Sequence, residues 1–527
     1  MGARPDMVTG PAGGRRPRPQ TDLGGATLGI TRTLAAFASE ASAIPDGIVA
    51  ETKRLVLDTL GCILGGWTTA KGRLAADLAA DLGGTPQAAI FGSGLRVSVD
   101  HASFANAELA NALDGDAGFL NVAHIVPVIL PAVLATGEAV GAGGRRILEA
   151  AIVGLEIAGR LAMAMTPVGE GHDGPATRYV VGPLCGYGYA ALGAAAGAGR
   201  LRGLDADRMA SALGLAAYYC PVPSVLKWLR TMPFSMVKYA PMGWTAQAGA
   251  TAALLAAKGY TADTSVLDSE HDFAQCWGSE RFETSYLLEG LGSEWESIRW
   301  LNYKSEPLCN LYRPHVWLLS TLRRVEHLSP GEIEEVVLRM HAPAGANRPY
   351  AGAPPATQEG AHMSAEFGVA VALTNVPPGP RWADLSLLVD PDIRQLMRKV
   401  RIEGNPPTTE VMYRPWKGVS IADILKRAPA EVEVKARGQT FRRTTDYAYG
   451  DMWAPPEMHF TTPDLIGKFS EMSRAVLPDG RRSEIVHLVL DDFERLQDLE
   501  PLVRLLGAAW RPSRMVPNPE GEGVPHA

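Results

Sequence analysis

The segment IVAETKRLVLDTLGCILGG, residues Ile48 to Gly66, carries its apolar residues at three- and four-residue intervals. This is the spacing of one buried face of a helix. The glycine pair at its end is typical of a helix stop. The segment therefore predicts a long buried helix, and the positions that define its apolar face are Leu55, Val56, Leu60, Ile63 and Leu64.

Helical periodicity continues through most of the chain up to about residue 290. It predicts helices at Ser103–Leu113, Val128–Val140, Arg145–Ala162, Gly186–Gly199, Asp205–Ala217 and Gly243–Lys258. The run LGAAAGAG, residues Leu192 to Gly199, is rich enough in glycine to suggest a phosphate-binding loop. It lacks the lysine and the preceding strand that such a loop requires, so we interpret it as a closely packed helix.

The pattern changes after about Ser293. A strand is predicted at Val336–Leu338, a helix at Ile393–Val400, and a strand at the alternating Glu431–Lys435, which a turn at 436–439 follows. Helical patterns return after Tyr449, with helices predicted at Pro463–Met472 and Leu499–Leu506.

The sequence therefore predicts a mainly α protein with a discontinuous all-helical domain and an inserted, smaller α+β lid domain. The predicted helical domain comprises residues 22–290 and returns at 446–512, and the lid domain comprises residues 291–445. A disordered tail is expected at residues 1–21 and a second tail at 513–527.

Composition limits the classes of partner and compartment. The 527 residues include 46% hydrophobic and 20% charged residues and carry a formal charge of -7, which is typical of a globular protein. No basic stripe interleaved with aromatic residues is present, so a nucleic-acid partner is not expected. The five cysteines form no CxxC pair, which argues against a zinc or iron–sulfur centre and suits a reducing cytoplasm. We expect side-chain chemistry without a metal or another cofactor.

The N-terminal region resembles an export signal, with Arg15-Arg16 before the apolar stretch Leu23–Phe37 and the small residues Ala41-Ser42-Ala43. Asp22 and Arg32 interrupt that stretch, and its apolar residues continue at helical spacing. We therefore expect a helix of the folded domain there. No apolar run reaches the length of about 20 residues that a membrane span needs, so no membrane association is expected.

The first candidate for chemistry is Leu113-Asp114-Gly115-Asp116 with His124 ten positions after Asp114, where a predicted helix gives way to a loop. A buried carboxylate and an imidazole that lie close together can act as base and acid. Alternatively, Asp114 and Asp116 are turn residues and His124 is a capping histidine.

The second candidate is Lys238, which stands in the apolar setting SMVKY. The third is the loop from Lys304 to His315, KSEPLCNLYRPH, which places Lys304, Cys309, Arg313 and His315 close together in the chain. Cations in apolar surroundings bind carboxylates strongly. Ordinary surface solvation is the alternative for each lysine.

These segments resemble the MmgE/PrpD family, which includes 2-methylcitrate dehydratases. The resemblance extends over roughly residues 30–510 in consistent order. It is carried by LVLDTLGCILG, by the alanine-rich helix that ends in LDGD with His124, by GWTAQAGATAALLAAKGY, by KSEPLC, by SAEF followed by VAVAL, and by the region 446–478.

The resemblance implies a helical domain with an α+β lid, a homodimer, and a metal-free active site at the domain boundary. It implies Asp114, His124, Lys238 and Lys304 as catalytic residues. Asp116, Cys309, Arg313, His315 and Phe367 are then the expected substrate-binding residues. Reactions of this family develop negative charge beside a carboxylate, which nearby cations stabilise.

The chain also departs from the family pattern. Ala117 and Gly118 stand where the second acid and a threonine are usual, and Ile125 replaces a proline. Phe367 replaces a tyrosine, and the usual histidine after the cysteine aligns with Arg313, or with His315 if the loop shifts. Two hydroxyl groups are thereby lost, which favours a non-standard substrate.

We expect a cytoplasmic, cofactor-independent lyase that acts on a small citrate-like di- or tricarboxylic acid. In this hypothesis Lys238, Lys304 and Arg313 bind carboxylates while Asp114 and His124 exchange protons at the neighbouring carbon. Dehydration is the first choice of reaction. Decarboxylation of a cis-aconitate-like acid, epimerisation or isomerisation, and a non-catalytic binding role are the alternatives.

Overall fold

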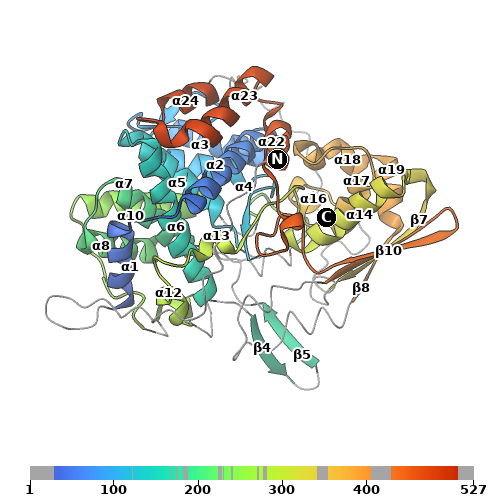
Figure 1. Cartoon of the computed structure of the whole chain (residues 1–527), viewed down its shortest axis with the longest axis horizontal. Coiled ribbons are helices and arrows are strands. Elements are labelled where there is room, and N and C mark those ends of the chain that lie inside the picture. The colour runs from blue at the N-terminus through green and yellow to red at the C-terminus, as the bar shows by residue number, and fades with distance from the viewer. Residues whose placement is uncertain are drawn as a thin grey trace, which may run out of the picture.

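The computed structural model describes residues 29–120, 123–165, 188–222, 228, 231–238, 241–269, 272–276, 282–340, 354–404 and 429–507, and the backbone of 168–173 and 176–181. The two predicted tails lie outside these residues. Within them the protein is mainly α, as predicted, with a large helical body and a smaller α+β unit beside it (Figure 1).

The first described helix of the helical body begins at Ile30. Its helices before residue 300 are α1 (Ile30–Glu40), α2 (Asp46–Gly66), α3 (Ala70–Leu82), α4 (Val99–Asn111), α5 (Val126–Ala139), α6 (Gly144–Ala164), α7 (Ala190–Leu201), α8 (Ala206–Tyr219), α10 (Met242–Ala257), α11 (Asp272–Cys276), α12 (Ser285–Leu288) and α13 (Glu296–Arg299). Short antiparallel strand pairs accompany them: β1 (Ala88–Ala89) with β2 (Arg96–Val97), β3 (Gly118–Phe119) with β6 (Leu301–Asn302), and β4 (Val168–Asp173) with β5 (Ala176–Val181).

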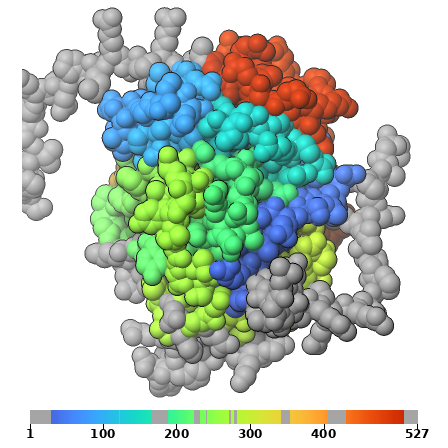
Figure 2. All heavy atoms as spheres, turned by 90° about the vertical axis from the view of Figure 1, so that its left-hand side faces the viewer, coloured from blue at the N-terminus to red at the C-terminus, as the bar shows by residue number. Residues whose placement is uncertain are grey.

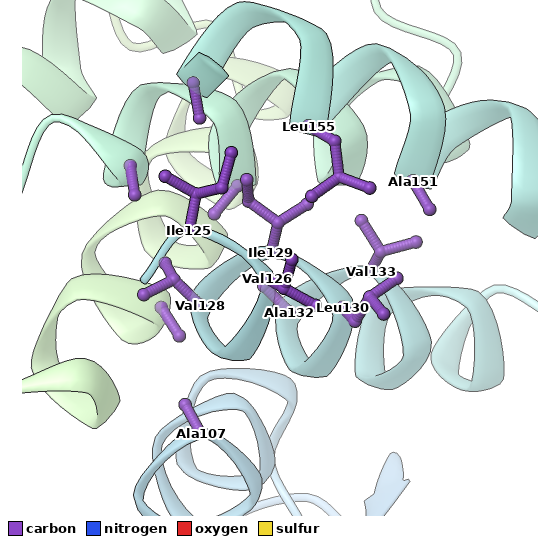
Figure 3. Close-up of a cluster of buried hydrophobic side chains, with 14 of the residues drawn as sticks. Ala107, Ile125, Val126, Val128, Ile129, Leu130, Ala132, Val133, Ala151 and Leu155 are labelled. Carbon is purple, nitrogen blue, oxygen red and sulfur yellow. The ribbon is translucent and has the colours of Figure 1, made fainter. Parts of the chain in front are cut away.

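Helix α5 lies at the centre of this body. It is apolar on all sides, and almost every residue from Val126 to Gly137 is buried, which is expected for a helix surrounded by other helices. Figure 3 shows its side chains packed toward Ala107 of α4 on one side and toward Ala151 and Leu155 of α6 on the other. This packing fixes the start of α5, and hence the position of His124, which lies two residues before Val126.

Glycines bring α6 and α7 into close contact. A Cβ atom on Gly193 would lie 2.4 Å from the carbonyl oxygen of Gly154, and one on Gly154 would lie 2.7 Å from that of Gly193. Neither position accepts a side chain without moving the backbone. The prediction that the glycine-rich run at 192–199 forms a closely packed helix is therefore confirmed.

The smaller unit is built on a four-stranded sheet with the order β10–β9–β7–β8. Its strands are β7 (Ile333–Met340), β8 (Val400–Gly404), β9 (Ala430–Ala436) and β10 (Gln439–Thr445), and only the pair β7–β8 is parallel. Its helices are η1 (Asn310–Tyr312), α14 (Arg313–Val325), η2 (Pro330–Glu332), α16 (Gln358–His362), α17 (Ala365–Ala372), η3 (Pro380–Ala383), α18 (Leu385–Val389) and α19 (Pro391–Arg398). The predicted helix Ile393–Val400 ends two residues early, because Val400 already pairs with Val336 in the sheet.

The chain then returns to the helical body. Its last elements are η4 (Pro456–Met458), α22 (Thr462–Ser473), α23 (Asp479–His487), η5 (Leu488–Asp492), η6 (Phe493–Arg495) and α24 (Glu500–Leu506). Helix α22 packs against α2, and α23 and α24 lie over the early helices (Figures 1 and 2). The N-terminal and C-terminal parts of the described chain therefore share one body.

Two hydrophobic cores support this division. The larger one joins residues from Leu34 onward with C-terminal residues such as Phe469 and Leu506. The smaller one contains buried residues between Leu308 and Ala436. The predicted domain limits, and the role of the smaller unit as a lid, stay predictions. No helix in the described part of the chain is long and apolar enough to cross a membrane.

Candidate active site

Asp114 lies at the turn that ends α4, and its side chain is fully buried. Its φ of 54° is in the left-handed region, which is strained for a residue with a Cβ atom. Lys304, which follows β6, holds this conformation: its Nζ donates to the carbonyl oxygen of Asp114 at 2.9 Å and to Oδ1 at 2.8 Å. Asp114 is thus one of the described non-glycine residues whose backbone is held in a left-handed conformation.

Lys238 approaches the same carboxylate from another part of the chain. Its Nζ lies 3.6 Å from Asp114 Oδ1 and donates to the carbonyl oxygen of Asn111 at 3.0 Å. Lys238 also has a left-handed φ, of 53°. Burial lowers the pKa of its ammonium group to about 8, although Asp114 opposes this shift. Two buried lysines thus converge on one carboxylate oxygen.

Asp116 orients the predicted histidine. His124 Nδ1 lies 2.6 Å from Asp116 Oδ2, and its Nε2 lies 3.7 Å from Asp114 Oδ1. Asn111 Nδ2 donates to the other oxygen of Asp116 at 2.9 Å. A carboxylate that accepts from Nδ1–H leaves Nε2 as the nitrogen available for proton exchange, which is the usual arrangement of a histidine base.

The charges of this cluster keep both aspartates ionised. Burial by itself would raise the pKa of Asp114, but Lys238 and Lys304 outweigh it and hold the pKa well below its usual range. Burial likewise opposes the ionisation of Asp116, whereas His124 lowers its pKa. Asp114 therefore acts as the fixed negative centre around which the cations are arranged.

A further ion pair supports the loop that follows Asp114. Lys468 of α22 donates from Nζ to Asp58 Oδ1 at 2.6 Å and to the carbonyl oxygen of Gly115 at 2.5 Å. Asp58 Oδ2 accepts from the backbone nitrogen of Ala117 at 3.2 Å. Sequence reasoning assigned neither residue to the site, although an acid within the buried face of α2 is unusual enough to be a signal.

His362 and Lys71 are also close to the cluster, and the sequence carried no motif that identified them. His362, at the end of α16, is buried and near enough to Lys238, Asp114, Lys304 and Lys71 for their charges to act on it. Lys71 of α3 is buried and lies 3.0 Å from Glu108.

Cys309 lies at the edge of the site. Its backbone nitrogen donates to the carbonyl oxygen of His362 at 2.9 Å, which ties the Lys304 loop to α16. Burial raises the pKa of the Cys309 thiol to about 11, and Asp114 adds to this. The group is therefore a neutral thiol at physiological pH, suited to contact but not to nucleophilic attack.

The predicted role of Arg313 as a carboxylate clamp is not supported. Its guanidinium pairs with Asp451 at 3.1 Å and donates to the carbonyl oxygens of Tyr303 at 2.5 Å and Tyr449 at 2.6 Å. Arg313 thus joins the segments at the two ends of the smaller unit. A buried cation with these partners stabilises the junction between segments.

His315 and Phe367 also face the interior of the smaller unit. His315 Nε2 lies 3.0 Å from the carbonyl oxygen of Arg339 in β7, and burial lowers its pKa to about 4. Phe367 belongs to the smaller hydrophobic core. Their role as substrate-binding residues stays a prediction; in the described structure both side chains contact the interior of the smaller unit.

The absence of a threonine at position 118 has a steric reason. A Cβ atom on Gly118 would lie 2.3 Å from Asn302 Oδ1 and 3.0 Å from Asn310 Nδ2. The amide side chains of these two residues therefore occupy the space that a larger residue would need.

Asp114, Asp116 and His124 place possible ligand atoms within 4.8 Å of one another. The charges around them do not suit a metal ion, because two lysine ammonium groups already lie within 3.6 Å of Asp114 Oδ1. A divalent cation would be repelled by both. The cluster is better suited to an anionic ligand that approaches the lysines.

An open cavity of about 890 Å³ lies where the helical body meets the smaller unit. Three of the segments that line it, around residues 68–73, 234–236 and 357–359, continue directly to Lys71, Lys238 and His362. The cavity is large enough for a small organic acid, and it lies along the segments that carry Lys71, Lys238 and His362.

Together, the described residues form a large helical body and a smaller α+β unit, with a buried cluster of two acids, an imidazole and two lysines. The MmgE/PrpD N-terminal domain matches residues 32–284, and the MmgE/PrpD C-terminal domain matches residues 307–492. The chain belongs to the MmgE/PrpD family.

Relatives of known activity resemble the chain over most of its length. It is 26% identical to the cis-aconitate decarboxylase of Mus musculus over 88% of this chain and 90% of the relative. It is 25% identical to the enzyme of the same name from Homo sapiens, over 88% of this chain and 91% of the relative. A cis-aconitate decarboxylase of Aspergillus terreus is 25% identical over 91% of this chain and 96% of the relative.

Proposed function

We propose that this chain is a carboxy-lyase that releases CO₂ from cis-aconitate or a closely related unsaturated tricarboxylic acid. The observation that carries the proposal is the convergence of Lys304, Lys238 and His124 on Asp114, with an open cavity along the segment that leads to Lys238. The relatives named above support decarboxylation in preference to dehydration, which was the first expectation from the sequence.

The lysines would bind the substrate carboxylates. A lysine ammonium has three N–H donors, and Lys304 uses two of them on Asp114, which leaves one for an incoming anion. A carboxylate that enters this region meets positive charge in a poorly solvated setting, where electrostatic stabilisation is strongest. This binding also positions the bond to be broken.

The reaction then requires one bond cleavage and one proton. The bond between a substrate carbon and its carboxylate breaks, CO₂ leaves, and the electron pair shifts across the neighbouring double bond. A proton is added at the far carbon, so that a tricarboxylate trianion and one proton give CO₂ and an unsaturated dicarboxylate. His124 Nε2 would deliver that proton, and Asp116 would hold the imidazole in position. No redox step or cofactor is needed for this balance.

The test is incubation of the purified protein with cis-aconitate in D₂O, followed by NMR. We expect CO₂ release and a dicarboxylate with one carbon-bound deuterium. His124→Ala and Lys304→Met should lower the rate by at least about a hundredfold, the scale for general acid catalysis. His459→Gln is the matched control, because His459 is buried but contacts only the carbonyl oxygen of Ala454 in the C-terminal return.

Other outcomes would replace the proposal. Loss of water from citrate or 2-methylcitrate, without CO₂ release from cis-aconitate, would identify a dehydratase. Deuterium exchange or inversion without loss of a group would identify an isomerase or epimerase. Binding of these acids without any reaction would identify a binding homologue.

A further inference from the structure

His362 differs from the other buried histidines. The described residues include four of them, His124, His315, His362 and His459. His124, His315 and His459 each have a ring nitrogen within hydrogen-bonding distance of a partner. Among the described residues, only His362 has both ring nitrogens buried and without a hydrogen-bond partner.

Unpaired buried nitrogens are costly, so their presence needs a reason. A polar group that leaves water without gaining a partner loses its hydration free energy, and nearly all such groups in folded proteins are paired. Unsatisfied polar groups occur where a ligand completes the hydrogen bonding. The imidazole of His362 stands in such a position, because it lies within range of the charges of Lys238, Asp114, Lys304 and Lys71 and its backbone is bonded to the Lys304 loop.

The backbone of α16 places His362 between the two lysine segments. The carbonyl oxygen of His362 accepts from Cys309 in the Lys304 loop at 2.9 Å. At the start of the same helix, Thr357 Oγ1 donates to the carbonyl oxygen of Phe234 at 3.0 Å, in the segment that leads to Lys238. Thr357 and Phe234 also line the cavity. The helix that carries His362 is therefore tied by hydrogen bonds both to the Lys304 loop and to the segment that leads to Lys238.

The protonation state of the ring suits a neutral hydrogen-bonding role. Burial lowers the pKa of His362 to about 3, and Lys238 lowers it further while Asp114 opposes the shift. A neutral imidazole offers one N–H donor and one acceptor. Lysines supply positive charge to any carboxylate, whereas a neutral donor with fixed direction distinguishes one orientation of the ligand from another.

We propose that His362 is a further substrate-contacting residue, which donates a hydrogen bond from a ring N–H to a carboxylate of the polycarboxylic substrate. This inference rests on the proposed function. It extends that function by assigning a neutral donor from the smaller unit to a site whose cations come from the helical body and the Lys304 loop. His362 also places a polar group just before α17, the helix in which Phe367 replaces the tyrosine of the family pattern.

The experiment compares His362→Phe, which keeps a ring but removes both nitrogens, with His362→Gln, which keeps a donor and an acceptor. The probes are cis-aconitate for turnover and tricarballylate, a saturated tricarboxylic acid, for binding by calorimetry. A lost hydrogen bond to a charged group corresponds to about a 10- to 100-fold loss in kcat/KM and in affinity for His362→Phe. His362→Gln should recover part of both.

Thermal unfolding separates this role from a structural one. Removal of two unpaired buried nitrogens should leave the Tm of His362→Phe at or above that of the wild type, while activity falls. A lower Tm with unchanged kcat/KM and affinity would overturn the assignment. So would equal losses of affinity in His362→Phe and His362→Gln.

The wild-type protein distinguishes failure of this inference from failure of the proposed function. If it binds tricarballylate but does not release CO₂ from cis-aconitate, decarboxylation is wrong, and the affinities of the two variants still decide the role of His362. If it binds neither acid, both the proposed function and the assignment of His362 are overturned. The His459→Gln variant should match the wild type in both measurements.

Discussion

Replacement of Asp114 by asparagine tests the charge arrangement of the site most directly. The side chain is fully buried, and two ammonium groups lie 2.8 Å and 3.6 Å from its Oδ1. At an effective dielectric constant of about 20, each attraction is on the order of 5–6 kcal/mol, and burial of the charges offsets much of it. Removal of one partner from a buried pair typically costs about 3–5 kcal/mol.

We therefore expect Asp114→Asn to lower the free energy of unfolding by about 3–5 kcal/mol and the Tm by roughly 3–5 °C, because the entropy of unfolding of a chain of this length is large. Tricarballylate should then raise the Tm of this variant more than that of the wild type. The reason is that both lysines lack an anion in Asp114→Asn, and a carboxylate of the ligand replaces the missing charge. Differential scanning calorimetry with and without the acid measures both effects.

Glu156→Gln provides the matched control. Glu156 and Arg160 form a buried pair at 2.6 Å within α6, away from the cluster around Asp114. This variant should lose comparable stability without any additional response to tricarballylate. An equal response in both variants, or a Tm of Asp114→Asn close to that of the wild type, would refute the electrostatic reasoning.

The dependence of stability on acidic pH provides a second test of the negative charge of Asp114. The folded-state pKa of Asp114 lies below its usual range, and the unfolded value is about 3.9. Its contribution to stability is therefore present above about pH 4 and is lost as the pH falls below that value. Asp114→Asn should lack this part of the acid dependence.

Three further predictions concern single positions. The kcat/KM for cis-aconitate should fall as the pH rises through about 8, where Lys238 loses its charge; Lys238→Met should lack this decline in a profile of rate against pH. Gly118→Thr should lower the free energy of unfolding by about 1–3 kcal/mol through overpacking against Asn302, and urea titration with the double variant Gly118→Thr/Asn302→Ala should show partial recovery. Arg313→Met should lower the free energy of unfolding by about 3–5 kcal/mol because Asp451 loses the guanidinium 3.1 Å away, with unchanged affinity for tricarballylate by calorimetry; weaker binding at unchanged stability would instead support Arg313 as a substrate clamp.

The sequence was informative where chemistry and periodicity coincide. The apolar repeats located most helices to within a few residues, because a buried helix face requires apolar residues at three- and four-residue intervals. The acid–imidazole motif and the isolated lysines pointed to Asp114, His124 and Lys238, which the structure brings together with Lys304. The spacing of these residues in the sequence could not show that two lysine ammonium groups and one imidazole all lie close to Asp114 Oδ1.

The remaining site residues depend on contacts between distant segments. Lys468 reaches a loop more than 350 positions earlier, and His362 stands in a short helix without a recognisable motif. The opposite problem arises at Arg313 and His315. Their chemical character suggested that they bind substrate, whereas in the folded chain their side chains contact backbone carbonyl oxygens of other segments. Burial and direction of a side chain are properties of the packed molecule, and a local pattern does not specify them.

The return of the chain to the helical body has a consequence for biosynthesis. The loop that follows Asp114 is supported by the ammonium group of Lys468 from α22, so a nascent polypeptide that still lacks this helix has the early helices but not the support for the loop. Catalytic competence should consequently appear only after translation is almost finished. Premature termination anywhere before this helix would yield an inactive fragment, even when most of the hydrophobic body has already been made.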